Sequence, residues 1–92
     1  MPLKASLPTA RELADLCLQH LARDPEQLAE FMMQSGLTPD QLRKLVGTDG
    51  FARGLIDYVV ANEPLLLAIA ADARLSPEAI MRVWGKLHAA EH

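Results

Sequence analysis

The sequence has few of the residues that usually indicate a specific chemistry. Its 92 residues contain one cysteine and four aromatic side chains. A single cysteine excludes an internal disulfide, so a reducing cytoplasm is the default location. Basic residues are also scarce, with nine Lys and Arg against twelve Asp and Glu. The chain therefore lacks the positive charge that binders of nucleic acid or of anionic membranes usually carry.

Long hydrophobic runs are missing as well. A membrane-spanning helix needs about 20 consecutive apolar residues, and charged residues interrupt this chain far more often than that. Residues 1–8 contain two prolines, one lysine and no apolar run, which does not fit a signal peptide. We interpret residues 1–8 as a flexible N-terminal arm and residues 9–92 as a single helical domain, the size expected for one modest core.

The abundant residues are leucine and alanine, with 16 and 14 copies, and both favour helices. At regular intervals the chain has a short polar residue followed by proline or an acidic residue. Such a polar residue can cap the start of a helix. These caps are Thr9, Asp24, Thr38, Thr48 or Asp49, Asn62 and Ser76. Gly36 and Gly47 can end helices in the left-handed conformation. We predict an all-α, compact bundle of six short helices, at about 10–22, 25–35, 39–46, 49–61, 64–73 and 77–89.

The two halves of the chain align at an offset of 38 residues. The segment Gly36–Asp40 lies over Arg74–Glu78, and Leu42 and Leu45 lie over Ile80 and Val83. Because caps and apolar stripes recur together, the pattern favours two three-helix units in tandem.

The helix expected at 64–73 differs from the other five. Leu65, Leu66, Leu67 and Ile69 point around its whole circumference, since successive residues turn by about 100°. This pattern predicts a central helix enclosed by its neighbours, or a helix with one face against a partner.

The middle of the chain resembles a family of short uncharacterised bacterial proteins known only as a domain of unknown function. The resemblance covers roughly residues 12–70. It is carried by Leu21-Ala22, Asp24-Pro25-Glu26, Leu28, Phe31, Ser35-Gly36-Leu37, Pro39, Leu42-Arg43, Gly47, Phe51, Leu55, Asp57 and the stretch from Glu63 to Leu67. It implies an all-α fold and no established activity.

The sequence offers no catalytic, cofactor or metal site. Cys17 and His20 share a helical face, but a zinc site needs four ligands and no second Cys/His pair is present. We therefore interpret Cys17 as a core residue. Asp57 lies four residues after Arg53, which favours an exposed ion pair over a catalytic acid. We predict that the protein is not an enzyme.

A helix-turn-helix DNA-binding regulator is the alternative function. Gly36, Leu37 and Leu42 fit the spacing of that motif, and Arg43 and Lys44 would lie on its reading helix. However, Asp40 begins that helix, where phosphates would be met, so nucleic acid is an unexpected partner.

We interpret the chain as a cytoplasmic protein-interaction module that acts as a homodimer or adaptor, with no membrane and no cofactor. Its large apolar side chains outnumber what one small core readily hides. The candidate interface residues are Met33, Leu66 and Trp84. Met33 follows another methionine, so one of the two must face outward, and the Trp84 N–H needs a partner.

Overall fold

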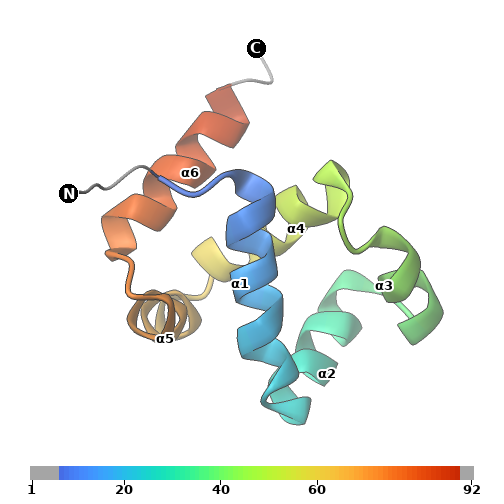
Figure 1. Ribbon diagram of the computed structural model, residues 1–92. Coiled ribbons are helices and arrows are strands. Elements are labelled where there is room, and N and C mark those ends of the chain that lie inside the picture. The colour runs from blue at the N-terminus through green and yellow to red at the C-terminus, as the bar shows by residue number, and fades with distance from the viewer. Residues whose placement is uncertain (1–6, 90–92) are drawn as a thin grey trace.

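The computed structural model describes residues 7–89, which form six helices and no strand (Figure 1). The helices are α1 (Ala10–Ala22), α2 (Pro25–Ser35), α3 (Pro39–Leu45), α4 (Asp49–Val60), α5 (Glu63–Ala73) and α6 (Pro77–Ala89). Every bound lies within one residue of its predicted position, and the all-α fold is confirmed. The expected arm at residues 1–8 falls largely outside the described residues.

The helix starts form where the sequence places polar caps. Thr9 and Glu12 make a reciprocal capping box, in which the Thr9 hydroxyl accepts the Glu12 N–H at 3.0 Å and the Glu12 carboxylate accepts the Thr9 N–H at 2.8 Å. Thr38 and Gln41 make the same pair of bonds before α3. These bonds satisfy amides that have no partner within the helix. They are local, which is why the sequence predicts them well.

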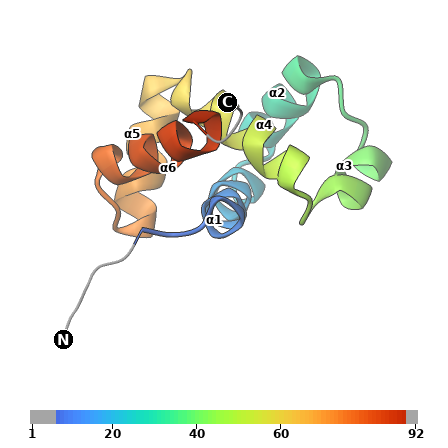
Figure 2. The same cartoon turned by 90° about the horizontal axis from the view of Figure 1, so that it is seen from above.

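Helices α1 and α4 form the centre of the molecule and pack against each other, with α1 crossing in front of α4 in Figure 1 and lying beside it in Figure 2. Both place a broad apolar stripe in the core. The buried residues of these two helices are Leu13, Ala14, Cys17, Leu21, Phe51, Ala52, Leu55, Ile56 and Val59. The ring of Phe31 from α2 packs edge-on against Phe51 and Tyr58 of α4. The remaining helices are therefore arranged around α1 and α4.

Of the two alternatives for the helix at 64–73, the central helix enclosed by its neighbours is wrong. Helix α5 lies at one side of the molecule (Figure 1) and buries only Leu65, Leu66, Ile69 and Ala70. Its outer face carries Leu67 and several alanines. The sequence pattern looked apolar all round because no charged residue stands between Glu63 and Asp72. An uncharged helix face is not necessarily a buried one, since exposed alanine leaves little apolar area in water.

The 38-residue offset recurs in the structure. Helices α2 and α5 both span 11 residues, begin 38 residues apart and end 38 residues apart. Each is followed by a left-handed residue, Gly36 with φ of 76° and Arg74 with φ of 58°. Helices α3 and α6 also begin 38 residues apart, but α3 has 7 residues and α6 has 13. The two three-helix units thus differ mainly in the third helix.

Membrane-spanning length is not reached by any single helix among residues 7–89. Helices α4 and α5 meet the length and composition required only when taken together, and they are bent by 112° at their junction.

Candidate functional site

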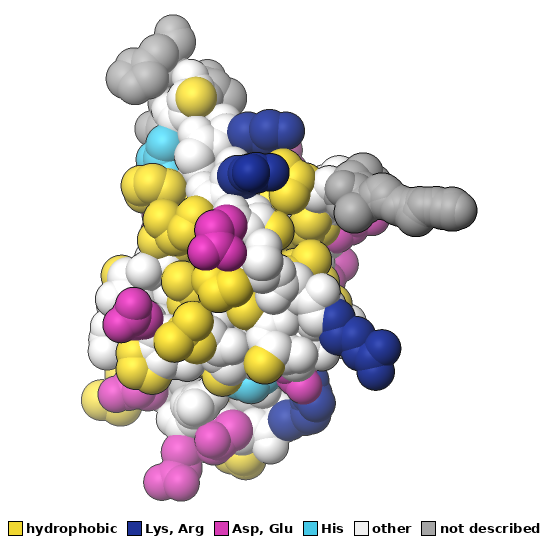
Figure 3. Space-filling model, turned by 90° about the vertical axis from the view of Figure 1, so that its left-hand side faces the viewer, with side chains coloured by type: hydrophobic (Ala, Val, Ile, Leu, Met, Phe, Trp, Pro, Cys, Tyr) yellow, Lys and Arg dark blue, Asp and Glu magenta, His cyan; other side chains and the backbone are white. Residues whose placement is uncertain are grey.

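A shallow groove of about 520 Å³ lies between α5 and α6. Side chains from the end of α4 and from both helices line it: Val60, Glu63, Leu66, Leu67, Pro77, Glu78, Met81 and Arg82. We call this set the α5–α6 groove. Figure 3 shows the side of the molecule formed by α5 and α6, where hydrophobic side chains gather across the middle of the face with acidic side chains beside and between them.

Two large apolar side chains of this groove are open to solvent. Leu67 is 50% exposed and Met81 is 39% exposed, whereas Leu66 beside them is 8% exposed and belongs to the core. Fully burying a leucine is worth about 1.5–3 kcal/mol, so a half-exposed one leaves a substantial part of that free energy unrealised. The groove therefore has an apolar floor and apolar walls that a partner could cover.

The corresponding positions of the first half of the chain carry other types of residue. At the 38-residue offset, Leu67 of α5 corresponds to Ala29 of α2, and Met81 of α6 corresponds to Arg43 of α3. Both counterparts are exposed. The same places in the first unit thus carry a small and a charged residue. Single exposed alanines and leucines are common in small helical domains. The α5–α6 groove differs from them because its large apolar residues have no large apolar counterparts in the first half of the chain.

The charges around the groove are of mixed sign. Glu63 stands in the first turn of α5 and Glu78 in the first turn of α6, where carboxylates interact favourably with the helix dipole. Arg82 follows Glu78 by one turn. The two carboxylates lie at the starts of α5 and α6, and Arg82 lies one turn further along α6. The groove is therefore apolar inside and mainly acidic around its edge.

The structure places the three predicted interface residues on three different helices and does not bring them together. Met33 of α2 is 82% exposed. Leu66 of α5 is buried and contributes to the floor of the groove. Trp84 of α6 is half-buried and faces α4. Of the three predicted residues, Leu66 lines the groove, but the predictions do not include the exposed groove residues Leu67 and Met81. The 38-residue alignment carried the missing signal, because it pairs each of them with a residue that is not a large hydrophobe.

The side chain of Asp57 is 43% exposed, but it also makes contacts with α6 that the sequence does not predict. Its Oδ1 accepts the Trp84 indole N–H at 2.9 Å and lies 2.7 Å from Nε2 of His88. The two rings are 4.7 Å apart between centroids. This cluster joins α4 to α6 and supplies the partner that the Trp84 N–H needs. This arrangement is that of a structural contact between helices, since Oδ1 of Asp57 meets both the indole of Trp84 and the imidazole of His88.

A second polar cluster joins α1 to α5. Asp72 forms an ion pair with Arg23, and its Oδ2 lies 3.1 Å from Nδ1 of His20. The hydrogen bond with His20 lowers the pKa of Asp72, and Arg23 adds to that effect against the opposing desolvation. His20 therefore contacts Asp72 of another helix.

Cys17 is a core residue, as predicted. It is fully buried, and burial raises the pKa of its thiol to about 12. The nucleophile of a cysteine enzyme is the thiolate, which this environment disfavours. No group of three or more His, Cys, Asp or Glu residues within 7–89 is arranged to hold a metal ion.

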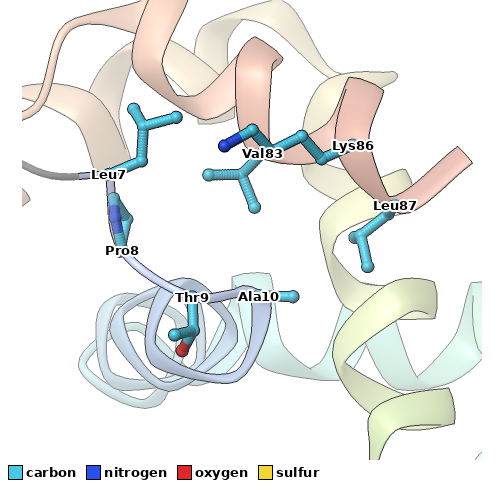
Figure 4. Close-up of a pocket in the computed structure, with 7 residues that line it drawn as sticks. All are labelled: Leu7, Pro8, Thr9, Ala10, Val83, Lys86 and Leu87. Carbon is cyan, nitrogen blue, oxygen red and sulfur yellow. The ribbon is translucent and has the colours of Figure 1, made fainter. Parts of the chain in front are cut away.

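Another cavity, of about 350 Å³, lies between the start of α1 and the second half of α6 (Figure 4). Leu7, Pro8 and Ala10 line one side, and Val83 and Leu87 line the other. Among the described residues that line it, Lys86 has the one charged side chain. The Thr9 hydroxyl is engaged by the Glu12 amide, so this cavity has few polar groups with which to recognise a ligand.

Helices α2 and α3 are the segment that the sequence offers for DNA binding. Arg43 forms an ion pair with Asp40 on the same helix. The acidic residue at the start of α3 thus occupies one of the two cations that would face DNA, while Lys44 is exposed.

The fold and the groove define an all-α six-helix protein with an uncovered apolar face. The family model described as "Protein of unknown function (DUF3572)" matches residues 8–90, so the chain belongs to this family. The match extends the resemblance noted over residues 12–70 to nearly the whole chain. No curated protein and no solved structure matches it.

Proposed function

We propose that this protein is an interaction module that self-associates through the α5–α6 groove. The observation that carries the proposal is the exposure of Leu67 and Met81 at places where the first unit has Ala29 and Arg43. The corresponding helices of the first half form with a small and a charged residue at these positions, which supports a role beyond helix formation for the large apolar ones. We choose a second copy of the chain as the partner because it is present wherever the protein is.

Binding is favoured over catalysis by the state of the reactive side chains. The Cys17 thiol is buried and the Asp57 carboxylate is engaged by α6. A buried cysteine without a disulfide fits a reducing compartment, and we propose a cytoplasmic location. Protein is the proposed partner in preference to nucleic acid, given the net charge of −3 and the acidic edge of the groove.

Sedimentation equilibrium of the purified chain, from about 10 to about 500 µM, tests this function, because small interfaces are weak and transient. We expect association to increase with concentration in the wild type and to be lost in Leu67→Asp. Met33→Asp is the matched control, since it puts the same charge at another exposed apolar position of a helix and should associate like the wild type. A wild type that stays monomeric throughout would refute the proposal, as would equal effects of the two substitutions.

A further inference from the structure

The first unit carries an uncovered apolar surface of its own, at the end of α3. Leu45 and Val46 are each 39% exposed, and none of the seven residues of α3 is buried. Their counterparts at the 38-residue offset, Val83 and Trp84, pack against the core. The difference arises because α6 packs against α1, α4 and α5, whereas α3 packs on no helix of residues 7–89 to a similar extent. We call Arg43, Lys44, Leu45 and Val46 the α3 tip.

The α3 tip and the α5–α6 groove are complementary in charge. The last turn of α3 carries Arg43 and Lys44, which also suit the negative end of the helix dipole. The first turns of α5 and α6 carry Glu63 and Glu78 at the edge of the groove. Because Arg43 is paired with Asp40, Lys44 is the cation that the tip offers to a partner. The groove has two carboxylates against one cation, Arg82, so its edge is acidic on balance. Complementary charges of this kind select the partner and its orientation more than they add affinity.

The two surfaces cannot meet within one molecule. Helix α3 lies at the opposite end of the molecule from α5 in both ribbon views (Figures 1 and 2). The largest dimension of the chain is 41 Å, and α1 and α4 separate the two ends. A contact between tip and groove therefore joins two copies.

We infer that the occupant of the α5–α6 groove is the α3 tip of a second copy, an inference that rests on the proposed function. Leu45 and Val46 of one copy cover Leu67 and Met81 of the next, and Lys44 approaches the carboxylates of Glu63 and Glu78. Such a contact is head-to-tail, so each molecule keeps one free tip and one free groove. Head-to-tail contacts build rings or open chains, whereas a groove that meets its own copy closes at a dimer.

Mixing two single variants distinguishes these arrangements. Leu67→Asp disables the groove and keeps the tip, while Leu45→Asp disables the tip and keeps the groove. We expect each variant alone to be monomeric in sedimentation equilibrium, and an equimolar mixture to form a dimer that grows no further. The mixture contains one working tip and one working groove, which is enough for a single contact. Helical circular dichroism confirms that each variant is folded.

The outcomes separate the inference from the proposed function. If Leu45→Asp associates like the wild type while Leu67→Asp does not, the groove meets another groove; the inference is overturned and the proposed function stands. If both variants are folded monomers and the mixture stays monomeric, the inference is again overturned. A wild-type protein that never associates refutes both the inference and the proposed function.

A charge exchange gives a second test that leaves the apolar residues in place. Lys44→Glu and Glu78→Lys should each weaken association by about tenfold or more in low salt, because like charges then face each other across the contact. Combining the two changes in one chain should restore it. An additive loss in the combined variant would contradict the pairing of Lys44 with the groove edge. Lys86→Glu is the control, since Lys86 lies on α6 outside the groove.

Discussion

Leu66 and Leu67 are neighbours in α5, yet the structure predicts very different consequences when each is shortened to alanine. Leu66 is 8% exposed and packs in the core, while Leu67 is 50% exposed. Burial of one methylene is worth about 0.8 kcal/mol, and a leucine-to-alanine change removes about three such groups. For Leu66 the lost transfer free energy and the cavity together should lower the free energy of unfolding by about 2–5 kcal/mol.

For Leu67 about half of the transfer free energy applies and no cavity forms, so we expect a loss of about 1 kcal/mol. Urea unfolding followed by circular dichroism measures both variants, at a concentration of about 5 µM or less so that self-association of a small, transient interface does not contribute. A chain of this size has a total stability of about 5–14 kcal/mol, so the difference between the two variants is readily resolved. Equal losses would refute the placement of α5, because they would mean that both leucines are enclosed as the sequence pattern alone suggested.

Two further predictions concern a backbone position and a carboxylate. Replacing Arg74, which has φ of 58°, by glycine should raise the free energy of unfolding by about 0.5–1 kcal/mol, because glycine adopts the left-handed conformation without the cost that a Cβ brings. The matching change Gly36→Ala should lower the free energy of unfolding. Urea unfolding that shows changes of the same sign for both variants would contradict this account. Asp72 has a folded-state pKa below its usual value of 3.8, so its contribution to stability is present above that value and is lost as the pH falls through the folded pKa. Asp72→Asn should therefore make stability less dependent on pH below about pH 4, and a pH profile as steep as that of the wild type would contradict the role of His20 and Arg23.

The helices and their caps could be predicted from the sequence because their causes are local. A threonine hydroxyl reaches the amide three residues ahead, as Thr9 and Thr38 do. Proline in the first turn and a left-handed residue after the last one act within a few residues. The 38-residue recurrence of these signals also matches the equal lengths and spacing of α2 and α5. The sequence by itself thus determined the element bounds, the helical class and the burial of Cys17.

Only the tertiary structure decided which apolar residues stay in water. The periodicity of α5 allowed Leu66 and Leu67 to exchange roles, since it does not specify which neighbours are near. The contact between Asp57 and Trp84 could not be predicted from the sequence, because it forms only when α6 packs against α4 and brings the indole to the carboxylate. The groove combines side chains from α4, α5 and α6, and no local pattern encodes that combination. It exists because α4 and α5 meet at 112° and α6 packs back across them, a geometry set by the whole core.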